Sequence, residues 1–282
     1  MLTDLFLVVV LISIWRYFSA SVLIQRQPNR FMQLLKLGGS AITVKEGYMK
    51  ENKASIAALA KAIAKVWKTG ERNMIIVHGA GSFGHALVLE YGINNGVRTM
   101  EQQKGCRKTQ EACANLSSLV VGALAKEGVP AVSIAPHSII VSKNRRIATF
   151  DESPVLESLA EGMLPVLYGD MVMDSALGFS VCSGDQVISH LAAWADRVVM
   201  ASNVDGIFAD GKLVGKITRA SFGKIKRHLS GSKTPDVTGG MAGKIAELME
   251  VKAPIYVVNA RKPDRVSALL LGKKTICTEI RF

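Results

Sequence analysis

The sequence predicts an α/β protein: a three-layer α/β/α sandwich around a mostly parallel central sheet. Short apolar runs alternate with helical patterns from Met32 onward, and glycine-containing turns follow several of these runs. The chain has 282 residues, 49% of them hydrophobic, which is enough to bury the core of one large domain. Strands that alternate with helices form a mostly parallel sheet with helices on both faces.

Each predicted strand is a short run rich in β-branched or other apolar residues, bounded by turn residues. The run from Met74 to Val77 is typical, because a turn with three glycines follows it directly. Two further segments have the pattern of hairpins, one turning at 143–144 and the other around 175–178. In chain order, strands are expected at 33–37, 74–77, 131–134, 164–167, 198–201, 255–258 and 275–278, and hairpins at 139–149 and 171–181.

Helices are predicted where apolar residues recur every three or four positions. The segment 53–69 places its apolar residues on one side and stops at Gly70. Asp185 is expected to cap a helix that ends near Ala195, and 230–240 is expected to be a polar, glycine-containing loop. In chain order, helices are expected at 53–69, 83–91, 103–126, 154–161, 185–195, 241–251 and 264–271.

Residues 1–31 form a hydrophobic extension before the first predicted strand. Its apolar run at 5–15 is shorter than the ~20 residues of a spanning helix, and Asp4 and Arg16 flank it. It resembles a signal-peptide core, although an acidic residue rather than basic ones precedes it. Three interpretations stay open: a membrane anchor, a targeting segment, or a start codon placed upstream of a true start at Met32. Membrane contact is expected only if the extension is present.

The net charge of +12 indicates an anionic ligand. No Lys/Arg block interleaved with aromatic residues is present, so nucleic acid is not expected as a partner. Phosphorylated small molecules attract the same charge. The four cysteines show neither a CxxC pair nor metal-ligand spacing, which predicts reduced thiols in a cytoplasmic protein and no metal-ligating residue.

The stretch 74–91 is the centre of the predicted site. A strand leads into a turn with Gly79, Gly81 and Gly84, and a helix follows. This arrangement directs backbone N–H groups and a helix dipole at an anion, and glycine allows a phosphate oxygen to approach closely. His85 lies in the first turn of the predicted helix, within reach of the same anion. The glycine spacing matches neither the dinucleotide fingerprint nor the common nucleotide-binding loop.

Four further stretches place glycine beside a charged or hydroxyl residue at strand ends, where open α/β sheets bind ligands. They are Lys-Leu-Gly-Gly-Ser at 36–40, Tyr-Gly-Asp at 168–170, Ser-Gly-Asp at 183–185 and Asp-Val-Thr-Gly-Gly-Met-Ala-Gly-Lys at 236–244. With these stretches, the chain resembles the amino acid kinase superfamily over residues 32–282. Because of His-Gly-Ala-Gly-Ser-Phe-Gly-His at 78–85, it resembles the isopentenyl phosphate kinases within that superfamily.

The resemblance implies ATP-dependent phosphorylation of isopentenyl phosphate to isopentenyl diphosphate, with Mg²⁺, in the alternate mevalonate pathway of isoprenoid biosynthesis. Dimethylallyl phosphate stays open as a second acceptor. The resemblance also implies a homodimer and a kinase domain at 32–282, with a phosphate-acceptor lobe at about 32–190 and a nucleotide lobe at about 191–282.

Two other functions stay open: a different kinase activity and a non-catalytic binding role. Another kinase of the superfamily would act on an amino-acid carboxylate, a nucleotide or a phosphonate. Such acceptors would need polar groups in the acceptor pocket. Met171 and Val181, which face each other across the second hairpin, suit a hydrocarbon tail instead. A binding module of this fold without catalysis is the other alternative, and the presence of Lys36, Asp185 and Lys244 argues against it.

The resemblance also implies roles for individual residues. Lys36 would contact the ATP phosphates, Lys45 would neutralise the transferring group, Asp185 would orient the lysines, and His85 would hold the acceptor phosphate. The catalytic set is therefore His85, Lys36, Lys45, Asp185 and Lys244. The expected ATP site comprises Lys36, Gly38, Gly39, Ser40, Gly81, Asn203, Asp205, Gly239, Gly240 and Lys244. The expected acceptor site comprises Gly79, Ala80, Gly84, His85 and Gly184, with Met171 and Val181 at the tail.

Three positions depart from the family pattern. Val44 replaces an Asp before the predicted lysine, Gln186 replaces the second Asp of Ser-Gly-Asp-Asp, and Asn203 replaces the first Asp of Thr-Asp-Val-Asp-Gly. The change at Asn203 concerns the adenosine side of the ATP site and leaves the phosphate-binding residues in place.

Overall fold

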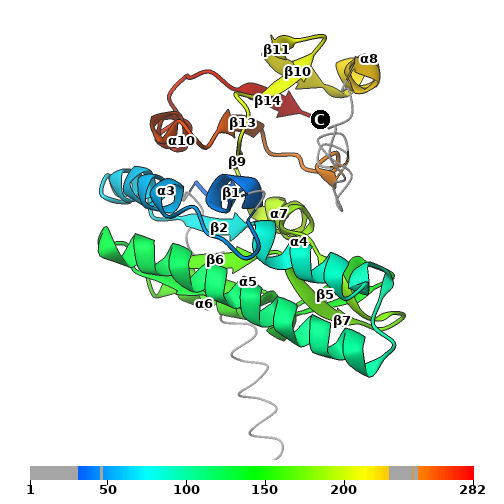
Figure 1. The fold of residues 1–282 in the computed structure, drawn as a ribbon. Coiled ribbons are helices and arrows are strands. Elements are labelled where there is room, and N and C mark those ends of the chain that lie inside the picture. The colour runs from blue at the N-terminus through cyan, green and yellow to red at the C-terminus, as the bar shows by residue number, and fades with distance from the viewer. Residues whose placement is uncertain (1–30, 45–46, 229–242, 244–246) are drawn as a thin grey trace, which may run out of the picture.

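An eight-stranded sheet runs through the protein and confirms the predicted α/β class (Figure 1). The structure is a computed structural model that describes residues 31–44, 47–228, 243 and 247–282. The strand order is β12-β14-β13-β9-β1-β2-β6-β3, and every neighbouring pair is parallel except β13 with β14. The strands are β1 (Gln33–Leu37), β2 (Met74–His78), β3 (Ala131–Ser133), β6 (Leu164–Tyr168), β9 (Arg197–Ser202), β12 (Lys216–Thr218), β13 (Ile255–Asn259) and β14 (Thr278–Arg281).

Helices cover both faces of this sheet, so the sandwich has three layers. Successive strand residues point to opposite faces, and in β1 this sends Leu35 and Leu37 into one core and Leu34 into the other. One core is closed by α3 (Lys53–Trp67), α5 (Met100–Lys126) and α10 (Pro263–Leu270). The other is closed by α6 (Ser153–Ala160), α7 (Gly184–Leu191) and α8 (Arg219–His228).

The two predicted hairpins pair with each other in a second sheet of four strands, in the order β5-β4-β7-β8. These strands are β4 (Ile140–Lys143), β5 (Arg146–Phe150), β7 (Asp170–Asp174) and β8 (Gly178–Cys182). The remaining elements are α2 (Gly39–Ile42), α4 (Gly81–Glu90), the hairpin β10 (Ile207–Ala209) with β11 (Lys212–Val214), and the 3₁₀ turns η1 (Ile93–Asn95), η2 (Pro136–Ser138) and η3 (Ala192–Trp194).

Several predicted element ends are wrong, two of them near side chains with particular hydrogen-bond partners. The last strand begins at Thr278 rather than ending there, because the Thr278 hydroxyl accepts the N–H of Ile207 and donates to the carbonyl of Val214. The helix expected to be capped by Asp185 is capped by Ser183, whose hydroxyl accepts a backbone N–H in the first turn. Asp185 is therefore inside the helix, and its carboxylate pairs with Lys36 instead.

Some predicted segments lie outside the described residues. These are positions 1–30 of the extension, the loop expected at 230–240, and residues 241–242 and 244–246 of the helix expected at 241–251. Within the part of the chain that the structure describes, no helix combines the length and the apolar character that crossing a membrane requires.

Asp174 connects the turns of the two hairpins. Its buried carboxylate accepts backbone N–H groups from Asn144 (3.1 Å) and Arg145 (2.7 Å) in one turn. In the other turn it accepts those of Ala176 (3.0 Å) and Leu177 (3.1 Å). Burial alone raises the pKa of this carboxyl, but the hydrogen bonds outweigh that effect and lower the pKa to about 2. The second sheet therefore depends on this negative charge.

Asp174→Asn should lower the melting temperature at pH 7 by roughly 3–12 °C. Hydrogen bonds to a charged group are worth about 1.5–3 kcal/mol, and about 1 kcal/mol shifts the melting temperature of a chain this size by about 2–4 °C. Because the pKa of Asp174 in the folded state lies below its ordinary value, the wild-type advantage is complete above about pH 4 and disappears as the pH falls toward 2.

Calorimetry of both proteins between pH 2 and pH 7 measures this difference, with Glu161→Gln on the exposed end of α6 as a control for the change in charge. A pH-independent difference, or an equal loss in the control, would contradict the role of Asp174.

Candidate active site

The loops that follow β1, β2 and β6 leave the main sheet side by side at its carboxyl edge. The first residue of each loop continues the hydrogen-bonding pattern by donating its backbone N–H to the neighbouring strand. These bonds run from Gly38 to Ala201 (2.8 Å), from Gly79 to Leu37 (2.9 Å) and from Gly169 to His78 (2.9 Å). The parallel register of the strands therefore brings the predicted ATP and acceptor loops together.

The loop at 38–40 and the loop at 79–81 touch through their backbones. A Cβ atom on Gly79 would lie only 2.6 Å from the backbone nitrogen of Gly39, and a Cβ on Gly39 would overlap the nitrogen of Gly81. Gly81 also has a φ of 52°, a left-handed conformation that favours glycine. Side chains are excluded here, so the two loops present one continuous backbone surface.

Two helix N-termini meet at this edge. Ala80 precedes α4, and Gly184 begins α7. A Cβ on Gly169 would lie 3.2 Å from the nitrogen of Gly184 and 3.6 Å from that of Ala80, so both backbone nitrogens border the same position. Nitrogens at helix starts lack intrahelical acceptors, and the dipoles of both helices favour negative charge nearby. The arrangement suits a phosphate group.

Lys36 and Asp185 form a buried ion pair between β1 and α7. The Lys36 Nζ contacts the Asp185 Oδ1, and each residue is only 6% exposed. A buried ion pair often stabilises a fold no better than apolar residues of the same size, because both charges lose their hydration. Its presence beside two glycine loops is explained better by a need for a fixed positive charge at this edge.

The carboxyl end of β9 approaches the loop at 38–40. The Asn203 Nδ2 donates to the carbonyl of Ser40 (2.8 Å), while its buried Oδ1 has no partner in the described part of the chain. Asp205 instead accepts hydrogen bonds from Asn259 (3.0 Å) and Arg265 (2.7 Å), and these contacts lower its pKa. Asn203 therefore borders the predicted nucleotide side, whereas Asp205 is partly occupied within the protein. That both contact ATP stays a prediction.

His85 lies on α4, half-buried. Because the helix begins at Gly81 rather than at residue 83, His85 is in its second turn and not, as predicted, in its first. It lies one turn beyond the start of the helix. Val88, three residues later on the same side, is buried in an apolar cluster.

This apolar cluster forms where α4, η1, α5, β7 and β8 meet. Met171 and Val181, expected at the acceptor tail, are direct register partners on β7 and β8 and both belong to it. Burial raises the pKa of the Cys106 thiol in the cluster to about 12, so this thiol is neutral at physiological pH. The cluster comprises the buried Val88, Ile93, Val97, Cys106 and Met171, with Tyr91, Phe179 and Val181 packed against them.

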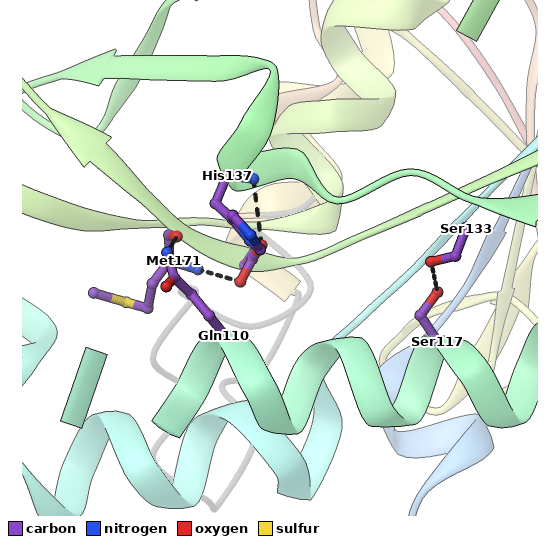
Figure 2. Close-up of polar contacts among 6 residues, drawn as sticks. Gln110, Ser117, Ser133, His137 and Met171 are labelled. Atoms are coloured by element: carbon purple, nitrogen blue, oxygen red, sulfur yellow. Dashed lines mark hydrogen bonds and ion pairs between the residues drawn. The ribbon is translucent and has the colours of Figure 1, made fainter. Parts of the chain in front are cut away.

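The buried Asp170, at the start of β7, pairs with the half-buried His137. The sequence marks Asp170 through the Tyr-Gly-Asp stretch, but it does not mark His137. The Asp170 carboxylate accepts the Nδ1–H of His137 (2.6 Å) and the backbone N–H groups of His137 (3.3 Å) and Met171 (2.8 Å) (Figure 2). The hydrogen bond to Asp170 raises the pKa of His137. Nothing in the sequence near His137 marks it, because its partner is 33 residues away.

His78, at the end of β2, is packed inside the protein rather than at the edge of the site. It is fully buried and stacks on Tyr168, with ring centroids 5.4 Å apart. Burial lowers the pKa of His78 to about 4, so the ring is neutral.

Four predicted site residues, Lys45, Gly239, Gly240 and Lys244, lie outside the described residues. Within the ranges described, no three His, Cys, Asp or Glu side chains are grouped as a protein-held metal would require.

Comparisons with known proteins agree with this geometry. The model of the amino acid kinase family matches residues 32–259. Isopentenyl phosphate kinase of Methanothermobacter thermautotrophicus is 38% identical over 267 residues, covering 88% of this chain and 98% of the relative. The protein of that name from Methanocaldococcus jannaschii is 34% identical, covering 89% and 99%. An X-ray structure of an isopentenyl phosphate kinase superposes with a TM-score of 0.75 and 34% identity, covering 88% of this chain and all of that one.

Proposed function

This chain belongs to the amino acid kinase family and, within it, to the isopentenyl phosphate kinases, and we propose that it transfers the γ-phosphate of ATP to isopentenyl phosphate. The products are ADP and isopentenyl diphosphate. One observation supports this assignment most directly: α4 begins at the phosphate-binding edge and carries His85 and then Val88 toward the apolar cluster. A molecule with a phosphate head and a short hydrocarbon tail matches this order along α4, which runs from the glycine loops to the apolar cluster.

Phosphoryl transfer between two phosphates requires that anions approach against their mutual repulsion. Catalysis of such a reaction is mainly positioning and electrostatic stabilisation. Lys36, held in place by Asp185, supplies a fixed positive charge beside the loop at 38–40. The helix starts at Ala80 and Gly184 provide backbone N–H groups on the acceptor side. Lys45 and Lys244 are proposed to add positive charge as the ATP binds.

The alternative acceptors fit the apolar cluster less well. An amino-acid carboxylate, a nucleotide or a phosphonate would place polar groups against Met171, Val181 and Val88, whose apolar side chains offer them no hydrogen bond. Burying such groups without partners costs several kcal/mol. The buried Lys36–Asp185 pair also argues against a binding module without catalysis, because an ion pair at this position has no evident structural advantage.

We propose that Mg²⁺ enters with ATP, since this ion commonly binds through substrate phosphates rather than through a cage of protein ligands. The described residues fit that mode: they offer lysine and glycine N–H groups, and the one buried carboxylate at the centre is paired with Lys36. When bound, Mg²⁺ neutralises charge on the ATP phosphates. The homodimer, the cytoplasmic location, the place in the alternate mevalonate pathway and the domain limits at 32–282 are proposed from family membership.

An ADP-release assay tests the function. We expect phosphorylation of isopentenyl phosphate, with dimethylallyl phosphate as a second acceptor. Glutamate, acetylglutamate and UMP should react at least 10²-fold less efficiently, because their polar groups would remain unpaired in the apolar cluster. Preferred turnover of any of these three would overturn the assignment.

His85→Ala should raise the KM for isopentenyl phosphate and lower kcat/KM by roughly 10²-fold or more, the scale of losing one charged donor. We expect His85 to donate a hydrogen bond to the acceptor phosphate rather than to remove a proton, since that phosphate is already a nucleophile near neutral pH. His85→Gln, which keeps a donor, should retain part of the activity, and the KM for ATP should change little.

His190→Ala is the matched control for His85→Ala and should keep wild-type kinetics. His190 lies near the C-terminal end of α7, whereas the start of α7 at Gly184 borders the site. Wild-type efficiency in His85→Ala would falsify the proposed role.

Met171→Ala and Val181→Ala should each improve turnover of longer isoprenyl phosphates relative to isopentenyl phosphate. Loss of a methylene-sized contact is worth ~1–3 kcal/mol in such discrimination, or about 10- to 200-fold. Met173→Ala, two residues along β7 and 55% exposed, is the control and should leave the preference unchanged. If both pocket variants keep the wild-type preference, the tail binds elsewhere.

A further inference from the structure

At Met171, side chains take the place of β4 as hydrogen-bond partners of the β7 backbone. β7 pairs with β8 along its whole length, but it pairs with β4 only at Met173 and Asp174. Toward the start of β7, the Gln110 Nε2 donates to the carbonyl of Met171 (2.8 Å), and the Asp170 Oδ1 accepts the Met171 N–H (2.8 Å). Both groups of the Met171 peptide therefore have partners (Figure 2).

Gln110 belongs to the same helix that forms part of the apolar cluster. It lies on α5, one turn after Cys106, whose buried side chain belongs to the cluster. The contact from Gln110 to Met171 spans 61 positions in sequence and ties α5 directly to β7. The separation between these two elements sets the space in which the Met171 side chain lies.

We propose that Gln110 is a positioning residue for acceptor specificity: its hydrogen bond to the Met171 carbonyl fixes β7 against α5 and thereby sets the length of hydrocarbon tail that the site accepts. This inference rests on the proposed function, because it concerns the tail of the same acceptor. Gln110 acts through Met171, and its effect should appear in the choice between acceptors rather than in the transfer step.

The physical reason is the cost of an unpaired carbonyl. Without the Gln110 amide, the Met171 carbonyl loses its only recorded side-chain donor in the described structure, and it gains a partner only if water enters between α5 and β7. Either the strand moves away from the helix or water occupies the gap. Both changes increase the space around the Met171 side chain, and more space there favours longer tails.

The test compares Gln110→Met, which has a similar length but no donor, with Gln103→Met on the exposed surface of the same helix. In Gln110→Met, kcat/KM for a ten-carbon isoprenyl phosphate should rise at least about 10-fold relative to isopentenyl phosphate. The KM for isopentenyl phosphate should increase, while its kcat and the KM for ATP stay within about twofold. Gln110→Lys, which restores an N–H donor, should return the preference toward the wild type.

A second measurement does not depend on turnover. The methyl resonance of Met171, assigned by ¹³C-methyl labelling and Met171→Leu, should shift in Gln110→Met and remain in place in Gln103→Met. An unchanged resonance overturns the inference even if the chain prefers another acceptor. An unchanged acceptor preference in a wild type that does phosphorylate isopentenyl phosphate also overturns it and leaves the proposed function intact. Failure of the wild type on isopentenyl phosphate counts only against the proposed function.

Discussion

The backbone contact between the loops after β1 and β2 is the constraint on which the site depends. Parallel pairing places the ends of these strands at one level, and Gly39, Gly79 and Gly81 then leave no room for side chains between the loops. Under the proposed function two phosphates have to come within bonding distance, and a bare backbone surface leaves room for both to approach it. The buried Lys36–Asp185 pair adds the charge that such an approach requires.

Under the proposed function, helix α4 would join the chemistry of the head group to recognition of the tail. Its start lies at the carboxyl edge of the sheet, His85 lies in the second turn, and Val88 enters the apolar cluster. Energy gained by burying a tail in this cluster would then position the acceptor phosphate, because one rigid element would carry both contacts. Binding energy from parts of a substrate that do not react is a general source of catalytic orientation.

The sequence predicted those parts of the structure that local patterns determine. Buried parallel strands such as β2 and β9 contain continuous apolar runs, and glycine turns mark the site loops. The three-residue strands β10, β11 and β12 are too short to show a period, so they were missed. The pairs His137–Asp170 and Gln110–Met171 form only when distant segments pack, and one sequence gives no local signal for them.

Strand β7 shows how polar contacts can define an apolar site. It begins and ends with buried carboxylates, Asp170 and Asp174, and each accepts backbone N–H groups from segments outside the strand. Gln110 adds a donor to the carbonyl side. Apolar packing alone has no direction and tolerates sliding, whereas hydrogen bonds with fixed geometry do not. The position of Met171 is therefore set by the polar groups around its backbone, and under the proposed function its side chain would pass that precision to the acceptor.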